Sequence, residues 1–163
     1  MLVVIMGVSG SGKSIVGKTL ASKLKLPFYD ADDFHPKKNI VKMQQGIPLN
    51  DLDRKPWLKT LSVNLARWEV ETGAVLACSA LKEMYRSIFN SAVDSEITWL
   101  YLYGCSELIR KRMTERREHY FKPNLLNTQL TDLEPPKYGY HFNVSSSVND
   151  IVSSALDKLG HID

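Results

Sequence analysis

Five short segments of the chain are apolar, or alternate between apolar and polar residues, as the strands of a buried sheet do. The run at 2–6, LVVIM, is continuous, and the run at 74–78, AVLAC, has the same character. Continuous runs of this length are typical of strands that are covered on both faces of a parallel sheet. The segment 97–103 alternates and is rich in β-forming residues, which also predicts a strand. The predicted strands are 2–6, 28–30, 74–78, 97–103 and 140–144.

Between these segments the apolar residues recur three to four positions apart, which is the spacing of a helix face. After residue 13, Val16, Leu20 and Leu24 follow this spacing, and Pro27 ends the pattern. A second proline, Pro56, suits the first turn of a helix over 55–71, because the first turn has no hydrogen bond for a proline to break. The predicted helices are 13–24, 36–45, 55–71, 81–89, 107–114 and 148–159.

Strands that alternate with helices imply a parallel sheet with helices on both of its faces. We therefore expect an α/β fold of three layers around a parallel five-stranded sheet. The chain has 163 residues and shows no internal repeat or linker, so we expect one domain over 1–163. The segment 116–136 is charged, contains proline and has no regular pattern. Connections of this length are functional lids or disordered loops, and we favour a mobile lid.

Composition places the chain among ordinary globular proteins, with 44% hydrophobic and 24% charged residues. The net charge of +3 is too small to argue for a nucleic-acid partner, and it fits either a pocket for anions or ordinary surface lysines. No run approaches the roughly 20 apolar residues of a membrane span, and the apolar start lacks the basic residues of a signal peptide. We expect a cytoplasmic protein whose two cysteines, Cys78 and Cys105, are reduced and buried.

The segment 7–14, GVSGSGKS, has the pattern G-x-x-x-x-G-K-[ST] of a phosphate-binding loop. It lies between a predicted buried strand and a predicted helix, which is the context that this loop requires. Its glycines let the backbone wrap around an anion, and the helix N-terminus adds its positive dipole end. We expect Lys13 to be catalytic through its charge on the β- and γ-phosphates of ATP, and Ser14 to bind Mg²⁺. The predicted nucleotide-binding residues of this loop are Gly7, Ser9, Gly10, Ser11, Gly12, Lys13 and Ser14.

Carboxylates gather directly after the predicted strand 28–30. A typical P-loop NTPase carries a Mg²⁺-binding Asp on a strand beside the loop, but the run 74–78 is followed by Ser79. The segment 30–33, DADD, supplies carboxylates at the same edge of a parallel sheet. On a strand, residues i and i+2 point to one side, so we expect Asp30 and Asp32 both to face the nucleotide. A structural role also stays open, because Asp is common at turns and helix N-caps.

Four further segments resemble, in order and spacing, the gluconate kinase (gluconokinase) family, which is related to shikimate kinase and the nucleoside monophosphate kinases. Together with the phosphate-binding loop, the resemblance covers residues 3 to about 136. It implies ATP-dependent phosphorylation of D-gluconate at its 6-hydroxyl, giving 6-phospho-D-gluconate and ADP, and homodimers are common in the family. The segments are 29–36 (YDADDFHP), 46–57 (GIPLNDLDRKPW), 78–86 (CSALKEMYR) and 119–135, which contains HYF, Gln129 and LEP.

The resemblance suggests roles for several side chains near these motifs. Asp32 would accept the proton of the 6-hydroxyl, and Asp30 would serve Mg²⁺ directly or through water. Arg54 would read the gluconate carboxylate with its guanidinium fork. His35 would either bind the sugar acid or fix a turn, and Gln129 would contact the substrate.

Two basic residues, Lys82 and Arg86, are spaced i and i+4, so a helix would present both charges on one face. They begin just beyond a predicted strand and could hold the acceptor or the γ-phosphate. A solvated basic helix face is the alternative interpretation.

The arginine-rich stretch 110–117 leads into the predicted lid. By the resemblance, Arg112 would stack on the adenine base and Arg116 would reach the phosphates as a catalytic residue when the lid closes. The family usually has Gly where this chain has Glu118, which puts the lid geometry in question. The segment 143–149 would line the adenine pocket.

Two other function classes fit parts of the sequence. A kinase of the same fold could act on another small acceptor, such as shikimate or a nucleotide, but the acceptor motifs argue against this. A nucleotide-dependent switch would typically carry an Asn-Lys-x-Asp motif for guanine, which the sequence lacks.

Overall fold

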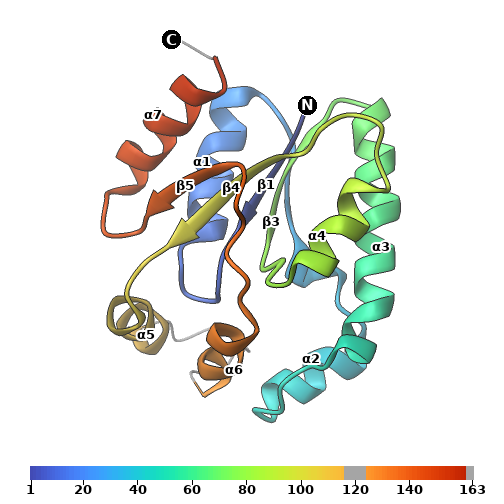
Figure 1. Cartoon of the computed structure of the whole chain (residues 1–163), viewed down its shortest axis with the longest axis vertical. Helices are drawn as coiled ribbons and strands as arrows, with labels where there is room; N and C mark the ends of the chain where they lie inside the picture. Colours follow the sequence, from blue (N-terminus) through green and yellow to red (C-terminus); the bar gives the residue numbers. More distant parts are fainter. Residues whose placement is uncertain (116–123, 161–163) are drawn as a thin grey trace.

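The computed structural model describes residues 1–115 and 124–160, and it has the three-layer α/β architecture that the sequence predicts (Figure 1). Five parallel strands form one sheet in the order β2-β3-β1-β4-β5. The strands are β1 (Leu2–Met6), β2 (Phe28–Asp30), β3 (Ala74–Cys78), β4 (Thr98–Tyr103) and β5 (Tyr140–Asn143). The strand predictions are therefore confirmed to within one residue at each end.

Seven α-helices and one 3₁₀ helix occur in the described residues. The first helix has the predicted bounds, whereas the third begins at Asp51 rather than at 55. The earlier start comes from a capping box, in which the side chains of Asn50 and Asp53 each accept a hydrogen bond from the other's main-chain N–H. The helices are α1 (Lys13–Leu24), η1 (Ala31–Phe34), α2 (Lys37–Gln44), α3 (Asp51–Val70), α4 (Glu83–Asn90), α5 (Ser106–Glu115), α6 (Leu125–Asp132) and α7 (Val148–Lys158).

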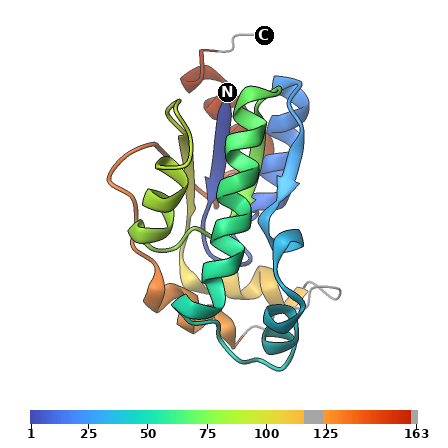
Figure 2. The same ribbon diagram turned by 90° about the vertical axis from the view of Figure 1, so that its right-hand side faces the viewer.

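The central strand β1 shows how the sheet divides the apolar core. Its side chains alternate between the two faces, and all of them are buried. Val3 and Ile5 pack in one cluster with residues of α1 and α7, whereas Val4 and Met6 pack in another with α3 and α4. Figure 2 shows the long helix α3 covering the second face. Burial on both faces explains why this strand is a continuous apolar run.

The segment 116–136 is less irregular than the sequence suggests. Its first part, 116–123, lies outside the described residues, but α6 follows at Leu125–Asp132. Leu125 and Leu126 on this helix are both buried, so tertiary packing stabilises a helix that local propensity does not reveal. The mobile lid stays a prediction.

The two cysteines differ in their exposure. Cys78 is buried as expected, but Cys105 is exposed, because it follows β4 in the turn to α5. Among the described helices, none combines the length and the apolar character that crossing a membrane requires.

The carboxyl ends of the strands meet at one edge of the sheet, where α2, α5 and α6 also lie (Figure 1). The phosphate-binding loop follows β1 there, and the acidic segment follows β2. In open parallel sheets this edge is where ligands bind.

Candidate functional site

The phosphate-binding loop has the tight geometry that its glycines allow. Gly12 adopts a φ of +93° and ends the loop at the N-terminus of α1. Gly7 lies so close to β4 that an added Cβ would come within 2.6 Å of the main-chain oxygen of Leu102. The Nζ atom of Lys13 donates a hydrogen bond to the main-chain oxygen of Val8, 2.9 Å away, so its ammonium lies over the loop. The predicted loop is therefore formed as an anion-binding turn at a helix N-terminus.

Ser14 and Asp30, the two predicted metal-binding residues, are in direct contact. The Ser14 hydroxyl donates a hydrogen bond to Oδ2 of Asp30 at 2.6 Å. Within the described residues, no cluster of three or more His, Cys, Asp or Glu side chains could hold a metal by itself. A hydroxyl and one carboxylate suit Mg²⁺, which usually takes few protein ligands and completes its shell with phosphates and water. The residues present therefore fit a Mg²⁺ ion that is shared with a nucleotide.

Asp32 reaches the site by a different route from the one that the sequence suggested. The strand ends at Asp30, and η1 begins at the next residue, so strand alternation does not position Asp32. Instead, Oδ1 of Asp30 accepts a hydrogen bond from the main-chain N–H of Asp32 and caps the 3₁₀ turn. The expectation of two alternate strand residues is wrong because the short Asp side chain caps the turn instead.

The surroundings of Asp32 favour its protonated form. Burial raises the pKa of its carboxyl to about 6, and the neighbouring carboxylate of Asp30 adds to this while Lys13 opposes it. The side chain remains 42% exposed, and it lines the open pocket described next. A carboxylate that has a pKa near neutrality and lies beside the phosphate loop is suited to accept a proton from a substrate.

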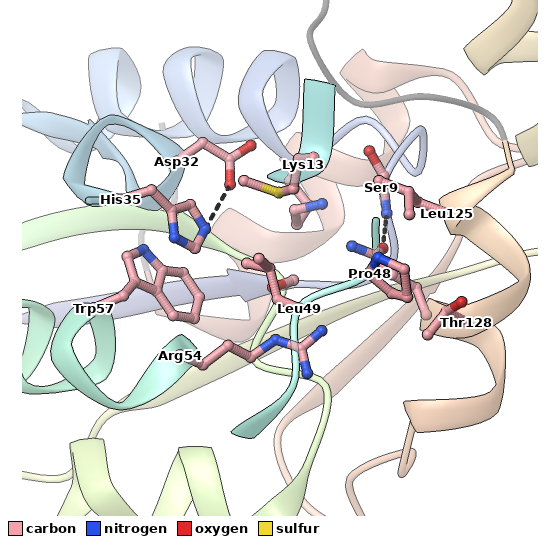
Figure 3. Close-up of a pocket in the computed structure, with 13 residues that line it drawn as sticks. Ser9, Lys13, Asp32, His35, Pro48, Leu49, Arg54, Trp57, Leu125 and Thr128 are labelled. Atoms are coloured by element: carbon pink, nitrogen blue, oxygen red, sulfur yellow. Dashed lines mark hydrogen bonds and ion pairs between the residues drawn. The ribbon is translucent and has the colours of Figure 1, made fainter. Parts of the chain in front are cut away.

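A pocket that is open to solvent lies between the phosphate loop, η1, α3 and α6 (Figure 3). Figure 3 shows Asp32 and Lys13 on one side of this pocket and Arg54 on the other. Sequence-predicted residues thus meet here from four separate segments of the chain. The lining residues are Ser9, Lys13, Asp32, His35, Met43, Pro48, Leu49, Arg54, Trp57, Ser79, Leu125, Thr128 and Gln129.

His35 is held as a neutral ring that lines the pocket. It stacks on Trp57 with ring centres 4.5 Å apart, and burial, together with the charge of Arg54, lowers its pKa to about 4. Its Nδ1 lies 3.3 Å from the amide nitrogen of Asn39, which can only donate. The ring proton therefore sits on Nε2, which is directed toward Asp32 at 4.0 Å. His35 can donate a hydrogen bond from Nε2 to a ligand that lies beside Asp32 in the pocket.

Arg54 presents one edge of its guanidinium to the pocket. Its hydrogen bonds within the described residues all use Nη1, which donates to the Tyr85 hydroxyl at 3.0 Å and to Oδ2 of Asp132 at 3.3 Å. Nε and Nη2 make no hydrogen bond to any described residue, and Arg54 is only 8% exposed. These two nitrogens form a fork that matches the two oxygens of a carboxylate.

Lys82 does not line this pocket. Its Nζ is 3.0 Å from Oδ1 of Asp51 and 4.0 Å from Asp132, and these carboxylates come from α3 and α6. Contact with Asp51 raises the pKa of Lys82, so the ammonium is held in this surface ion pair. Its charge is therefore engaged with the neighbouring helices rather than with this pocket.

Arg86 is a correction to the sequence analysis. The pair Lys82 and Arg86 does not form one open basic face, because Arg86 points inward and is 1% exposed. Its guanidinium donates hydrogen bonds to the main-chain oxygens of Ala80, Leu81 and Glu134, at 2.8, 3.1 and 2.8 Å. The same group also contacts the carboxylate of Glu83 and the hydroxyl of Tyr138. Its donors are engaged in holding the fold, so Arg86 is a structural residue here.

Gln129 lines the same pocket as Asp32 and Arg54, and it also contacts the phosphate loop. Its Oε1 accepts a hydrogen bond from the main-chain N–H of Ser9, 2.7 Å away. Direct contact with a substrate stays a prediction.

A second cavity lies on the other side of the phosphate loop. It is lined by Gly10, Ser11 and Gly12 of the loop, by Arg112, and by the segment 144–148. Nη2 of Arg112 donates to the main-chain oxygen of Val144 at 2.7 Å. This is the place that the sequence analysis gave to the adenine base, although stacking by Arg112 stays a prediction. Arg116 and Glu118 lie outside the described residues.

Two residues beside the pocket received no role from the sequence. Tyr85 is buried, and its hydroxyl bridges Arg54 and Asp51. Asp132 contacts Arg54 from α6. Only the spacing of Asp132, three residues after Gln129, could have pointed to it, and that spacing has meaning only if the segment is helical.

Comparisons with known proteins agree with this geometry. A family model described as shikimate kinase matches residues 9–141. The chain is 44% identical to a probable gluconokinase of Xenopus tropicalis, over 94% of this chain and 90% of the relative. It is 42% identical to the thermoresistant gluconokinase of Escherichia coli K12, over 82% and 76%.

A solved structure gives the same result in three dimensions. The crystal structure of a gluconokinase from Sinorhizobium meliloti 1021 superposes with a TM-score of 0.88 at 38% identity, covering 98% of this chain and 91% of that one. The chain therefore belongs to the gluconokinase family, within the shikimate kinase group of P-loop kinases.

Proposed function

We propose that this protein transfers the γ-phosphoryl group of ATP to the 6-hydroxyl of D-gluconate, giving 6-phospho-D-gluconate and ADP. The observation that carries the proposal is the Nε–Nη2 edge of Arg54, which makes no hydrogen bond to any described residue and lies across the pocket from Asp32 and Lys13 (Figure 3). A six-carbon sugar acid has a carboxylate at one end, which suits Arg54, and a primary hydroxyl at the other, which suits Asp32 and Lys13. The gluconokinases that share about 40% of its residues support the same acceptor.

The chemistry needs positioned charge more than covalent help. The oxygen of the 6-hydroxyl attacks the γ-phosphorus, the bond from that phosphorus to the β,γ-bridging oxygen breaks, and ADP leaves. Asp32 takes the proton of the hydroxyl, and its raised pKa makes it a competent acceptor at neutral pH. Lys13 and the loop N–H groups stabilise the charge on the phosphoryl oxygens.

Mg²⁺ completes the proposed site. Ser14 and Asp30 would hold it, directly or through water, on the phosphate side of Asp32. When bound, the ion neutralises charge on the β- and γ-phosphates. Arg116 is proposed to reach the phosphates from the lid, and Arg112 to contact the base, both on the family resemblance. On the same basis we propose a cytoplasmic homodimer with no nucleic-acid or membrane partner.

An acceptor panel tests the proposal. Purified protein, ATP and Mg²⁺ are assayed for ADP release with D-gluconate, shikimate, a nucleoside monophosphate or no acceptor. Release that requires gluconate and yields 6-phospho-D-gluconate is the expected result. Equal turnover with shikimate would favour the alternative of another small acceptor, and slow release independent of any acceptor would favour a nucleotide-dependent switch.

A further inference from the structure

Helix α6 contacts both substrate sites through side chains three residues apart. Gln129 accepts a hydrogen bond from the main-chain N–H of Ser9 in the phosphate loop, at 2.7 Å. Asp132 accepts one from Nη1 of Arg54 in the acceptor pocket, at 3.3 Å. Residues spaced i and i+3 lie on one face of a helix, so a single rigid face bridges the two sites.

Buried leucines and a main-chain hydrogen bond anchor the helix near both of its ends. Leu126 is fully buried in the main core, and Leu125 packs with Met43 and Leu49 beside the acceptor pocket. Just after its C-terminus, the main-chain N–H of Glu134 bonds to the main-chain oxygen of Leu81, at 2.9 Å. A short helix that is anchored in this way can shift as one unit when one of its contacts changes.

We propose that α6 couples the two substrate sites, with Gln129 and Asp132 as its positioning residues. The inference rests on the proposed function, because it takes gluconate as the ligand of the Arg54 wall. Asp132 and Tyr85 together fix Nη1, so that the Nε–Nη2 edge keeps its direction into the pocket. Gln129 fixes the loop amide of Ser9, which is close to where the transferred phosphoryl group must lie.

The consequence is reciprocal by thermodynamic linkage. A nucleotide that orders the phosphate loop also orders Gln129, which bonds to the loop. Because Gln129 and Asp132 are on the same helix, the contact between Asp132 and Arg54 is ordered as well. Gluconate bound at Arg54 must then favour nucleotide binding by the same factor. We expect the factor to be roughly two- to tenfold, the range that one net hydrogen bond supports.

Titration calorimetry measures this factor directly. The affinity for gluconate is determined with and without a non-hydrolysable ATP analogue and Mg²⁺, and the affinity for the analogue with and without gluconate. For each ligand, the coupling ratio is its affinity in the presence of the other ligand divided by its affinity alone. The wild-type protein should give the same coupling ratio for gluconate and for the analogue. Gln129→Met, which keeps the length of the side chain but removes the acceptor oxygen, should bring both ratios close to one.

Two more variants separate coupling from stability. Asp132→Asn keeps an acceptor oxygen but loses the charge on a residue at the end of the helix, so it should fold, raise the gluconate KM more than it lowers kcat, and lower the ratio. Thr131→Ala, an exposed neighbour on α6, should keep the wild-type ratio. A thermal unfolding scan of each variant identifies any that is merely destabilised.

The outcomes distinguish this inference from the proposed function. If the wild type binds gluconate but its ratio is one, or if both Gln129→Met and Asp132→Asn keep the wild-type ratio, the coupling role of α6 is overturned while the function stands. If the wild type does not bind gluconate at all, the proposed function and the coupling fail together.

Discussion

Two arginines on neighbouring helices show what separates a binding residue from a structural one. Arg54 on α3 and Arg86 on α4 are both nearly buried, at 8% and 1% exposure. Both lie in sequence segments that resemble the gluconokinase family. Arg86 gives its donors to three main-chain oxygens, a carboxylate and a tyrosine. Arg54 uses only Nη1 within the described residues and leaves the other edge toward the pocket. The donors that Arg54 leaves unused within the described residues, rather than its charge or burial, are the reason that we propose Arg54 and not Arg86 as a binding residue.

The difference arises from what each arginine has to support. Ala80 lies in the connection between β3 and α4. It has a φ of +41°, which is costly for a residue with a Cβ. Arg86 donates to the main-chain oxygens of Ala80 and Leu81 and so holds this connection in place. Ser79, at the start of the same connection, lines the pocket. Arg86 therefore supports the site indirectly, by stabilising a segment that lines it.

The largest expected effect is on stability, at Arg86. Arg86→Met should lower the free energy of unfolding by about 3–5 kcal/mol, because it strips several buried acceptors of their partner. Arg54→Met should cost clearly less, since it removes fewer contacts. Urea unfolding of both variants measures the difference. Equal losses at the two positions would contradict the division between a structural and a binding arginine.

Asp32, on the opposite side of the pocket from Arg54, should control turnover rather than binding. Asp32→Asn keeps the shape but removes the proton acceptor, so kcat should fall by roughly 10²–10⁴ while the gluconate KM changes less. Asp30→Asn should instead raise the Mg²⁺ concentration that gives half-maximal rate. Steady-state kinetics across a Mg²⁺ series measure both effects. Rescue of Asp32→Asn, rather than Asp30→Asn, by excess Mg²⁺ would mean that the two roles are reversed.

Substitution of Arg54 by lysine tests the two-pronged geometry of the guanidinium while the charge stays the same. Arg54→Lys should weaken gluconate binding by about 1–3 kcal/mol, because lysine lacks the two-pronged edge, whereas ATP binding should barely change. Calorimetry with gluconate and with an ATP analogue measures the two affinities. An unchanged gluconate affinity would remove Arg54 from the acceptor site.

The smallest expected effect is in the pH profile. Because the pKa of Asp32 is raised to about 6, its basic form is present above that pH and is lost as the pH falls through it. The value of kcat/KM for gluconate should therefore decline below about pH 6, whereas His35, with a pKa of about 4, stays neutral over this range. Asp30→Asn should move the decline to lower pH, because the Asp30 carboxylate helps to raise the pKa of Asp32. A profile without this limb would exclude Asp32 as the base.

The sequence predicted the parts of this molecule in which local pattern decides structure. The five strands, α1 and the phosphate loop follow from apolar runs and from one motif. Arg86 could not be placed, because an i, i+4 spacing does not tell whether a helix face points to solvent or to the core. Helix α6 and Asp132 were missed for a related reason: the helix is stabilised by tertiary burial of Leu125 and Leu126. Asp32 was placed correctly at the sheet edge, but through the wrong local geometry.

The most direct test of the account is discrimination between two acceptors that differ at one end. D-gluconate and D-glucitol share the hydroxylated carbon chain, but only gluconate carries a carboxylate for the Nε–Nη2 edge of Arg54. The wild-type kcat/KM should favour gluconate by about 100-fold or more, the scale of two charge-assisted hydrogen bonds. The preference should collapse in Arg54→Met. Equal kcat/KM values for the two acceptors in the wild-type protein would contradict the central claim that this pocket recognises a sugar acid.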